Sequence, residues 1–311
     1  MPAPERIPPR GGVSPARRGD AAPRAAAPGV PARPPGGDAP QDRTAALLAR
    51  GELTVVGRIT DASNAVLYAT VADGRDAVPC VYKPVAGERP LWDFPRGTLA
   101  GREVAAYEVC RALGWDLVPP TVLRDGPYGE GMCQQWIGPP PDGGGPPPNA
   151  AEQLLDLVDA EEPEPGWKAV GLAETAPGRT ALLVHADDAR LRRLAVLDAV
   201  INNADRKGGH LLPAPGGGLR AIDHGVTFHT DNKLRTLLWG WAGEPLPEDA
   251  VDPLRRLKHA LADGSPLSRR LSALIDATEL AALRRRTEEL LASGRHPVPT
   301  GEWPAFPWPP I

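Results

Sequence analysis

With 311 residues, 41% of them hydrophobic, the chain is long enough to form one large domain or two lobes around a buried core. A net charge of −4 gives no reason to expect nucleic acid as a partner. The sequence has no apolar run typical of a signal peptide and no stretch of the roughly 20 apolar residues that a spanning helix needs. We therefore expect a cytoplasmic protein without a transmembrane segment.

Residues 1–41 differ in composition from the rest of the chain. They hold 11 of the 39 prolines, and six arginines against three acidic residues give them a charge of +3. Such a segment buries too little apolar surface to offset the entropy lost on ordering, so a disordered tail is expected. Contact of this tail with nucleic acid or anionic lipid is an alternative, but a solvated tail is favoured.

Residues 42–138 carry the pattern of a small sheet with one helix. Hydrophobic residues that alternate with a period of two predict strands at 53–59, 65–71, 78–84, 121–123 and 132–137. Helical spacing covers 99–113, and Gly114 ends it. We expect these elements to form an N-terminal lobe.

A flexible joint is expected at 139–150, which consists almost entirely of Pro, Gly and Asp. The second lobe, 151–311, is mainly helical, and the whole chain is thus of the α+β class. Helices are predicted at 150–159, 187–204, 247–262, 267–274 and 278–293, strands at 210–213 and 219–223, and an extended arm packed on the surface at 303–310.

Two aspartates stand at positions suited to phosphoryl transfer. Asp205 follows a predicted helix, and Asp223 follows a predicted strand and precedes Gly225. In transfer from ATP, one carboxylate orients the attacking hydroxyl and another holds the metal ion that neutralises the phosphates. An aspartate at such a chain break can also simply cap a turn through its own backbone. The pair with its flanking residues favours the functional interpretation.

Lys83 and the turn between the first two strands are candidates for phosphate contact. An ammonium at the end of the third strand could reach a nucleotide, and Glu103 in the next helix could hold it in position. Taken alone, Lys83 would more often be a surface lysine over a strand edge, but Asp205 and Asp223 downstream in the correct order favour phosphate contact. In the turn, Ser63 and Asn64 could donate to a phosphate or form an ordinary hairpin tip.

These motifs together resemble a known kinase core. Asp205-Arg206 followed by Asp223-His-Gly225 is similar to the catalytic and metal motifs of the type II phosphatidylinositol 4-kinases and, more loosely, of the phosphoinositide 3/4-kinase and HipA-like kinases. Other matching segments, in chain order, are Tyr82-Lys-Pro84, Glu103-Val-Ala-Ala-Tyr107, Leu117-Val-Pro-Pro-Thr121, Gln134-Gln-Trp-Ile137 and Trp239-Gly-Trp241. The similarity extends over roughly residues 52–260. The chain also resembles actinobacterial proteins called phosphatidylinositol 3/4-kinase-like.

The resemblance implies a two-lobed protein-kinase-like fold that uses ATP with Mg²⁺ or Mn²⁺. It implies Asp205 and Arg206 as catalytic residues and Asp223 as a metal ligand. Lys83, held in position by Glu103, would contact the α- and β-phosphates. The hinge segment that the resemblance implies falls at Gln135, Trp136 and Ile137. Trp136 and Ile137 would line an apolar slot for adenine.

One position departs from the family pattern. The family places Asn five residues after the catalytic Asp, whereas this chain has His210. A neutral imidazole suits Mn²⁺ or Zn²⁺ better than Mg²⁺. His210 is therefore a candidate second metal ligand, with hydrogen bonding to a phosphate or a structural role as alternatives.

The expected function is transfer of the γ-phosphoryl group of ATP to a hydroxyl acceptor. The acceptor is unknown and could be a protein, a lipid or a small molecule. A pseudokinase that binds nucleotide as a scaffold, or an enzyme that transfers AMP instead of phosphate, are the alternatives. The Cys-rich lipid-attachment segment of the eukaryotic lipid kinases is missing.

Overall fold

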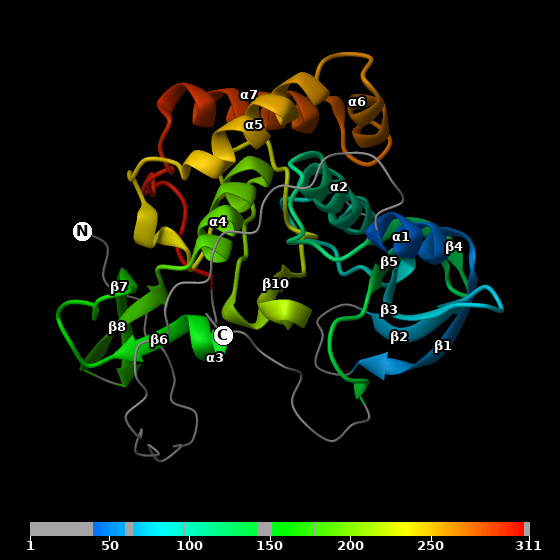
Figure 1. Cartoon of the computed structure of the whole chain (residues 1–311), viewed down its shortest axis with the longest axis horizontal. Coiled ribbons are helices and arrows are strands. Elements are labelled where there is room, and N and C mark those ends of the chain that lie inside the picture. The colour runs from blue at the N-terminus through cyan, green and yellow to red at the C-terminus, as the bar shows by residue number, and fades with distance from the viewer. Residues whose placement is uncertain (1–39, 60–64, 96, 142–150, 177, 308–311) are drawn as a thin grey trace.

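The computed structural model describes residues 40–59, 65–95, 97–141, 151–176 and 178–307 (Figure 1). An N-terminal sheet with its helices lies to one side of a larger lobe in which helices predominate, with a second, smaller sheet at the opposite end. The predicted two-lobed α+β fold is confirmed. The predicted tail, apart from residues 40 and 41, and most of the predicted joint lie outside the described residues.

The N-terminal lobe is built on five antiparallel strands in the order β1-β2-β3-β5-β4. The strands are β1 (Glu52–Ile59), β2 (Val66–Ala72), β3 (Ala77–Pro84), β4 (Thr121–Gly126) and β5 (Gly129–Gln135). Helix α1 (Pro40–Arg50), which the sequence pattern did not predict, covers this sheet and buries Leu48 completely. Arg124 of β4 fixes the end of α1 because its Nη1 donates to the carbonyls of Leu48 and Gly51, at 2.7 and 2.9 Å.

Helix α2 (Leu99–Ala112) connects the two lobes. A 3-10 helix, Val85–Gly87, and a long linker precede it. The helix is buried on most sides because it packs on β4 and β5 and also on helices of the second lobe. At Gly101 the backbone of α2 approaches the second lobe so closely that a Cβ would lie 2.7 Å from the carbonyl oxygen of Leu274.

The second lobe is organised around a central helix, α4 (Ala189–Ile201). Asp188 caps its N-terminus by accepting from the amides of Arg190 and Leu191, and Asn202 ends it in a left-handed conformation with φ of 54°. The helices α5 (Glu248–Ala260), α6 (Pro266–Leu271) and α7 (Ala277–Ser293) follow. These helices form one large apolar core with the inner face of α2.

The segment predicted as a helix at 150–159 is mostly not helical. Helix α3 covers only Ala151–Leu154, and β6 (Leu155–Val158) follows directly. This strand joins β8 (Arg179–Ala186) and β7 (Trp167–Ala176) in an antiparallel sheet that the sequence pattern did not predict. Consecutive residues of β8, from Leu182 to Val184, are buried, so the strand lacks the alternation on which strand prediction depends.

Smaller elements complete the lobe. The predicted hairpin is confirmed as β9 (Leu211–Ala214) paired with β10 (Gly218–Ala221), with 3-10 helices at Gly208–His210, Pro215–Gly217 and Trp239–Trp241. The predicted arm is described as far as residue 307, and the carbonyl of Ala305 accepts from Thr236 N and Trp239 Nε1, at 3.1 and 2.8 Å. Within the described ranges no helix combines the length and the apolar character needed to cross a membrane.

Candidate active site

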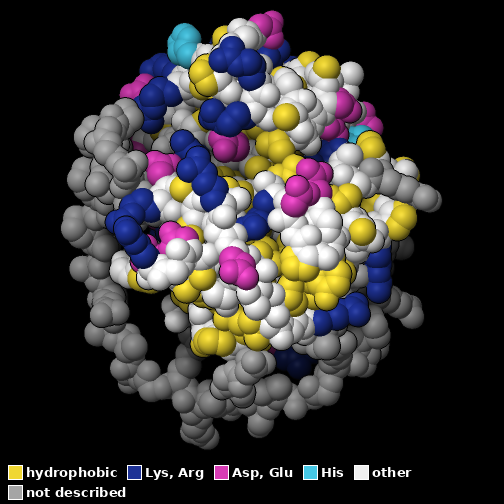
Figure 2. All heavy atoms as spheres, turned by 90° about the vertical axis from the view of Figure 1, so that its right-hand side faces the viewer, with side chains coloured by type: hydrophobic (Ala, Val, Ile, Leu, Met, Phe, Trp, Pro, Cys, Tyr) yellow, Lys and Arg dark blue, Asp and Glu magenta, His cyan; other side chains and the backbone are white. Residues whose placement is uncertain are grey.

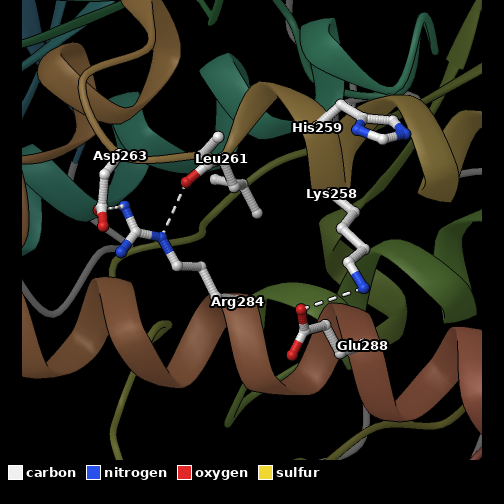
Figure 3. A pocket seen from close by; sticks show the side chains of 7 residues that line it. Lys258, His259, Leu261, Asp263, Arg284 and Glu288 are labelled. Atoms are coloured by element: carbon white, nitrogen blue, oxygen red, sulfur yellow. Dashed lines mark hydrogen bonds and ion pairs between the residues drawn. The ribbon is translucent and has the colours of Figure 1, made fainter.

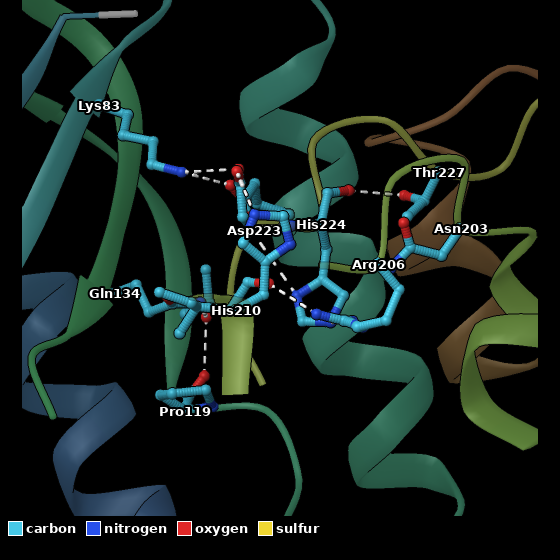
Figure 4. A network of polar contacts seen from close by, with 12 residues as sticks. Lys83, Pro119, Gln134, Asn203, Arg206, His210, Asp223, His224 and Thr227 are labelled. Atoms are coloured by element: carbon cyan, nitrogen blue, oxygen red, sulfur yellow. Dashed lines mark hydrogen bonds and ion pairs between the residues drawn. The ribbon is translucent and has the colours of Figure 1, made fainter. Parts of the chain in front are cut away.

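Lys83, Glu103 and Asp223 come from three distant segments and meet between the lobes (Figure 4). The neighbours of Lys83 in β3, Tyr82 and Pro84, face the buried side of the sheet, so the alternation of the strand directs Lys83 to the opposite face. Its Nζ lies 2.7 Å from Glu103 Oε1 and 3.3 Å from Asp223 Oδ1. The structure thus brings these three predicted site residues together.

Glu103 ties β3 and α2 to the loop after β10. While Oε1 accepts from Lys83, Oε2 accepts from the backbone amide of His224 at 2.9 Å. The carboxylate is almost completely buried and both its oxygens are used. Burial tends to lower the pKa of Lys83, but Asp223 and Glu103 outweigh it and raise the pKa above its ordinary value. Lys83 therefore stays charged at neutral pH.

Asp223 has an unusual backbone conformation and a carboxylate available to a ligand. Its φ of 61° lies in the left-handed region that non-glycine residues rarely adopt, although Asp tolerates it better than most. Such strain is found frequently at functional sites. The side chain is 53% exposed, and the ammonium of Lys83 holds the pKa of Asp223 below its usual range.

His210 lies beside Asp223, with Nε2 at 3.4 Å from Asp223 Oδ2. Burial lowers the pKa of His210, which keeps the imidazole neutral near pH 7. A neutral imidazole and a carboxylate are both donors for a divalent ion. In the part of the chain that the structure describes, no group of three or more His, Cys, Asp or Glu side chains could hold a metal ion. Asp223 and His210 would supply two ligands to a bound ion, with substrate phosphates and water as the others, and the imidazole suits Mn²⁺ better than Mg²⁺.

Asp205 lines a cavity of about 250 Å³ together with Lys83, Glu103 and Asp223. Its Oδ1 accepts from Arg235 Nη2 at 2.9 Å, and its Oδ2 lies 3.1 Å from Lys207 Nζ. Both oxygens are thus fixed in position by cations. Arg235 also donates to the carbonyl of Ala204 at 2.7 Å, so it holds the loop as well as the carboxylate.

Arg206 is completely buried and contacts only protein groups. Its guanidinium makes two 2.9 Å bonds to the carboxylate of Asp198 and donates to the carbonyl of Ile222 at 2.9 Å. Its Nη2 also lies 2.7 Å from His224 Nε2 (Figure 4). Arg206 thus joins the loop of Asp205 to the strand end that carries Asp223. These contacts hold the loop in place, and the catalytic role that the resemblance implies for Arg206 stays a prediction.

Of the remaining predicted nucleotide-binding residues, the described ones, Gln135, Trp136 and Ile137, are not among those that line this cavity. Gln135 pairs with Cys80, three positions along β3 from Lys83, which corresponds to roughly 10 Å. The amides of Gln135 and Trp136 already donate to the carbonyls of Pro120 and Pro79, each at 2.9 Å. Ile137 follows them. Ser63 and Asn64 lie outside the described residues.

Two site residues had no signal in the sequence. Arg235 is distant in sequence from Asp205 and stands in no recognisable motif. Glu88 lines the cavity from the linker before α2 and accepts from the amides of Leu99 and Ala100, at 3.2 and 2.8 Å. It therefore caps the helix that carries Glu103. Only the tertiary structure brings either residue to the site.

Comparison with known proteins identifies the family. No family model matches the chain. It is 50% identical over 269 residues to protein Rv2133c of Mycobacterium tuberculosis (strain ATCC 25618 / H37Rv), which covers 86% of this chain and 96% of that protein. The chain belongs to the family of Rv2133c. Membership covers both lobes, but the relative's name describes no activity.

Several solved structures show a distant likeness. Fam20 of hydra, solved with sugar, has a TM-score of 0.45 at 15% identity, covering 85% of this chain and 91% of that one. The Golgi casein kinase with Mn/ADP bound has a TM-score of 0.42 at 14% identity, covering 87% and 80%. The Helicobacter pylori proinflammatory kinase CtkA scores 0.35 at 12% identity, covering 78% and 97%. A likeness at such scores carries no information about activity.

Proposed function

We propose that the chain is an ATP-dependent phosphotransferase of the phosphatidylinositol 3/4-kinase-like type, which moves the γ-phosphoryl group of ATP to a hydroxyl acceptor. The observation that carries this proposal is the cavity in which Lys83, paired with Glu103, faces Asp223 while Asp205 lines the same wall. A fixed ammonium, an exposed carboxylate and a second, positioned carboxylate are the groups that phosphoryl transfer requires.

The phosphate side of the site consists of Lys83, Asp223 and His210. Lys83 keeps its charge and would bind phosphate oxygens, and Glu103 prevents it from moving away. Asp223 and His210 would hold Mg²⁺ or Mn²⁺, which when bound supplies positive charge to the phosphate oxygens. The adenine would extend along the sheet toward the chain that leaves β5 at Gln135.

The acceptor side is Asp205. We assign to it the orientation of the acceptor hydroxyl and the late acceptance of its proton. Arg235 and Lys207 restrict the orientation of its carboxylate, so the group is already in position before substrate arrives. Since the transition state of phosphoryl transfer is loose, positioned charges of this kind supply most of the acceleration.

One observation favours a second candidate, a nucleotide-binding pseudokinase: His210 stands where the resemblance places an Asn ligand. Transfer of AMP is a third outcome that the same contacts could serve. The three functions differ in which phosphate of ATP is transferred: the γ-phosphate in a kinase, the α-phosphate in AMP transfer, and none in a pseudokinase.

The test uses ATP labelled at the α- or the γ-phosphate, with Mg²⁺ or Mn²⁺ and the purified full chain as its own acceptor. We expect γ-label to be transferred to the protein or released as phosphate, and Asp205→Asn to reduce this at least ~100-fold. Asp252→Asn, an exposed position in α5, is the matched control and should react as wild type. Transfer of α-label would show nucleotidyl transfer, and movement of neither label would support the pseudokinase.

A further inference from the structure

A second and larger cavity, about 540 Å³ in volume, lies between α7 with the chain that follows it and the loop around residues 230–234. Its lining combines three arginines, Arg285, Arg286 and Arg295, with apolar side chains that include Leu234, Leu290 and Val298. The volume is in the range of pockets that hold small organic ligands. None of these residues belongs to the proposed active site.

Neighbouring arginines of α7 differ in whether a carboxylate neutralises their charge. Arg284 does not line this cavity and has a carboxylate partner. It lies 2.7 Å from Asp263 Oδ1 and donates to the carbonyl of Leu261 at 2.8 Å (Figure 3). It also donates to the hydroxyl of Ser268 at 2.8 Å. A partly buried guanidinium is usually paired with a carboxylate in this way.

Arg286, half a turn further along, has neutral acceptors only. Its Nε and Nη1 donate to the carbonyls of Val200 and His229, both at 3.0 Å. Its Nη2 is buried, and no residue in the described part of the chain accepts a hydrogen bond from it. Burial, with repulsion from Arg285 as a smaller cause, lowers the pKa of Arg286 to about 10. Glu289 and Glu279 attract this charge from a distance, but no carboxylate is hydrogen-bonded to it in the described part of the chain. A guanidinium with a buried, unbonded Nη2 is costly to a protein, which suggests that an anion belongs beside it.

The charged side chains that line the cavity give it a net positive charge. Arg295 donates to the carbonyl of Gly243 at 2.7 Å, which is again a neutral partner. Among the described residues, Glu289 is the single acidic one that lines the cavity, and it lies 3.8 Å from Arg285. Three guanidinium groups thus face one carboxylate across a partly apolar cavity.

We infer that this cavity binds an amphipathic organic anion. Its phosphate or carboxylate head would meet Arg286 and its neighbours Arg285 and Arg295, and its apolar body would lie against Leu290 and Val298. Charge-assisted hydrogen bonds from guanidinium groups recognise both kinds of head group.

The occupant would contact the loop that positions the proposed catalytic carboxylate. Arg286 and Arg285 hold the carbonyls of His229 and Thr230, at 3.0 and 3.4 Å. The same loop continues to Arg235, which fixes Asp205. An effect of the ligand on turnover rests on the proposed function, whereas binding itself does not.

The experiment titrates the full chain, without nucleotide, with decyl phosphate and with decanoate below their micelle concentrations, by isothermal calorimetry. Inorganic phosphate and 1,2-decanediol serve as probes that have only the head or only the apolar body. We expect saturable binding of one equivalent of at least one amphiphile, and much weaker binding of both partial probes. Arg286→Gln should weaken binding about tenfold or more, since a hydrogen bond to a charged group is lost. Arg284→Gln, which removes the same charge on the other side of α7, should bind as wild type.

A second variant keeps the test decisive if Arg286→Gln does not fold. Val298 is 57% exposed at the edge of the cavity, so Val298→Glu should leave the fold intact while its carboxylate competes for the arginines. Absence of saturable binding to the folded wild type would overturn the inference. The inference would also be overturned if the folded cavity variants bound the amphiphile as tightly as the wild type does. Neither result would bear on the phosphotransferase proposal, which is tested by label transfer from ATP.

Discussion

Arg102 of α2 offers a quantitative test of how the two lobes are held together. Its side chain is 1% exposed, forms an ion pair with Glu279 of α7 and donates to the carbonyl of Thr227 at 2.5 Å. The guanidinium also lies over the ring of Phe94, 4.8 Å from its centroid. Replacing Arg102 by Leu removes these contacts and leaves the carboxylate of Glu279 buried without its cation. Loss of one partner of a buried pair costs roughly 3–5 kcal/mol.

The assay is urea unfolding followed by tryptophan fluorescence. Arg102→Leu should lower the free energy of unfolding by about 3–5 kcal/mol. The control is Arg270→Leu, which removes an arginine whose side chain is 49% exposed and which pairs with Glu108 of the same helix α2 at 2.9 Å. An exposed pair of this kind contributes about 1 kcal/mol or less. If Arg102→Leu costs no more than Arg270→Leu, the buried pair is not what joins α2 to the second lobe.

The double variant Arg102→Leu/Glu279→Leu separates the two contributions. Replacing both partners of a buried pair by apolar residues is frequently neutral, so the double variant should recover much of the lost stability. Recovery would show that the cost arises from the unpaired carboxylate. A double variant as unstable as Arg102→Leu would contradict this explanation.

Two further predictions concern stability. Burial lowers the pKa of both His185 and His296 to about 4, so between about pH 6.5 and pH 4 the unfolded chain takes up protons that the folded chain does not. The free energy of unfolding should therefore be highest above that range and fall on acidification, by roughly 2 kcal/mol for each histidine at pH 5. Equal urea midpoints at pH 8 and pH 5 would contradict this. Gly101→Ala should cost about 1–3 kcal/mol, measured by the same unfolding assay, because its Cβ would lie 2.7 Å from Leu274 O. Gly57→Ala meets no atom within 4 Å and serves as the control; an equal effect of the two variants would exclude the clash as the cause.

The long helices and the sheet of the first lobe could be predicted because their patterns are local. The hydrophobic spacing of α2, α4, α5 and α7 gave their positions to within a few residues. The structure brings together site residues that stand in recognisable motifs: Lys83, Glu103, Asp205 and Asp223 line one cavity. Their roles in chemistry stay predictions.

What the sequence could not show depends on contacts between distant segments. The sheet of β6, β7 and β8 has a strand buried over consecutive residues, so no alternation marks it. Arg235 and Arg102 look like surface arginines in the sequence, yet one fixes Asp205 and the other is buried between the lobes. A buried charge is identified by its partner, and the partner of Arg102 lies 177 positions away.

The central claim is that Asp223 and Lys83 form a metal-dependent nucleotide site, and a thermal-shift titration with ATP tests it most directly. A ligand at ~100 times its dissociation constant adds roughly 2.7 kcal/mol to stability, which corresponds to a shift of several degrees. We predict such a shift for wild type with ATP plus Mg²⁺ or Mn²⁺, its loss in Asp223→Ala, and its retention in the exposed-position control Asp252→Ala. No shift with either metal in a wild-type protein that melts cooperatively, or an equal shift in Asp223→Ala, would contradict the account.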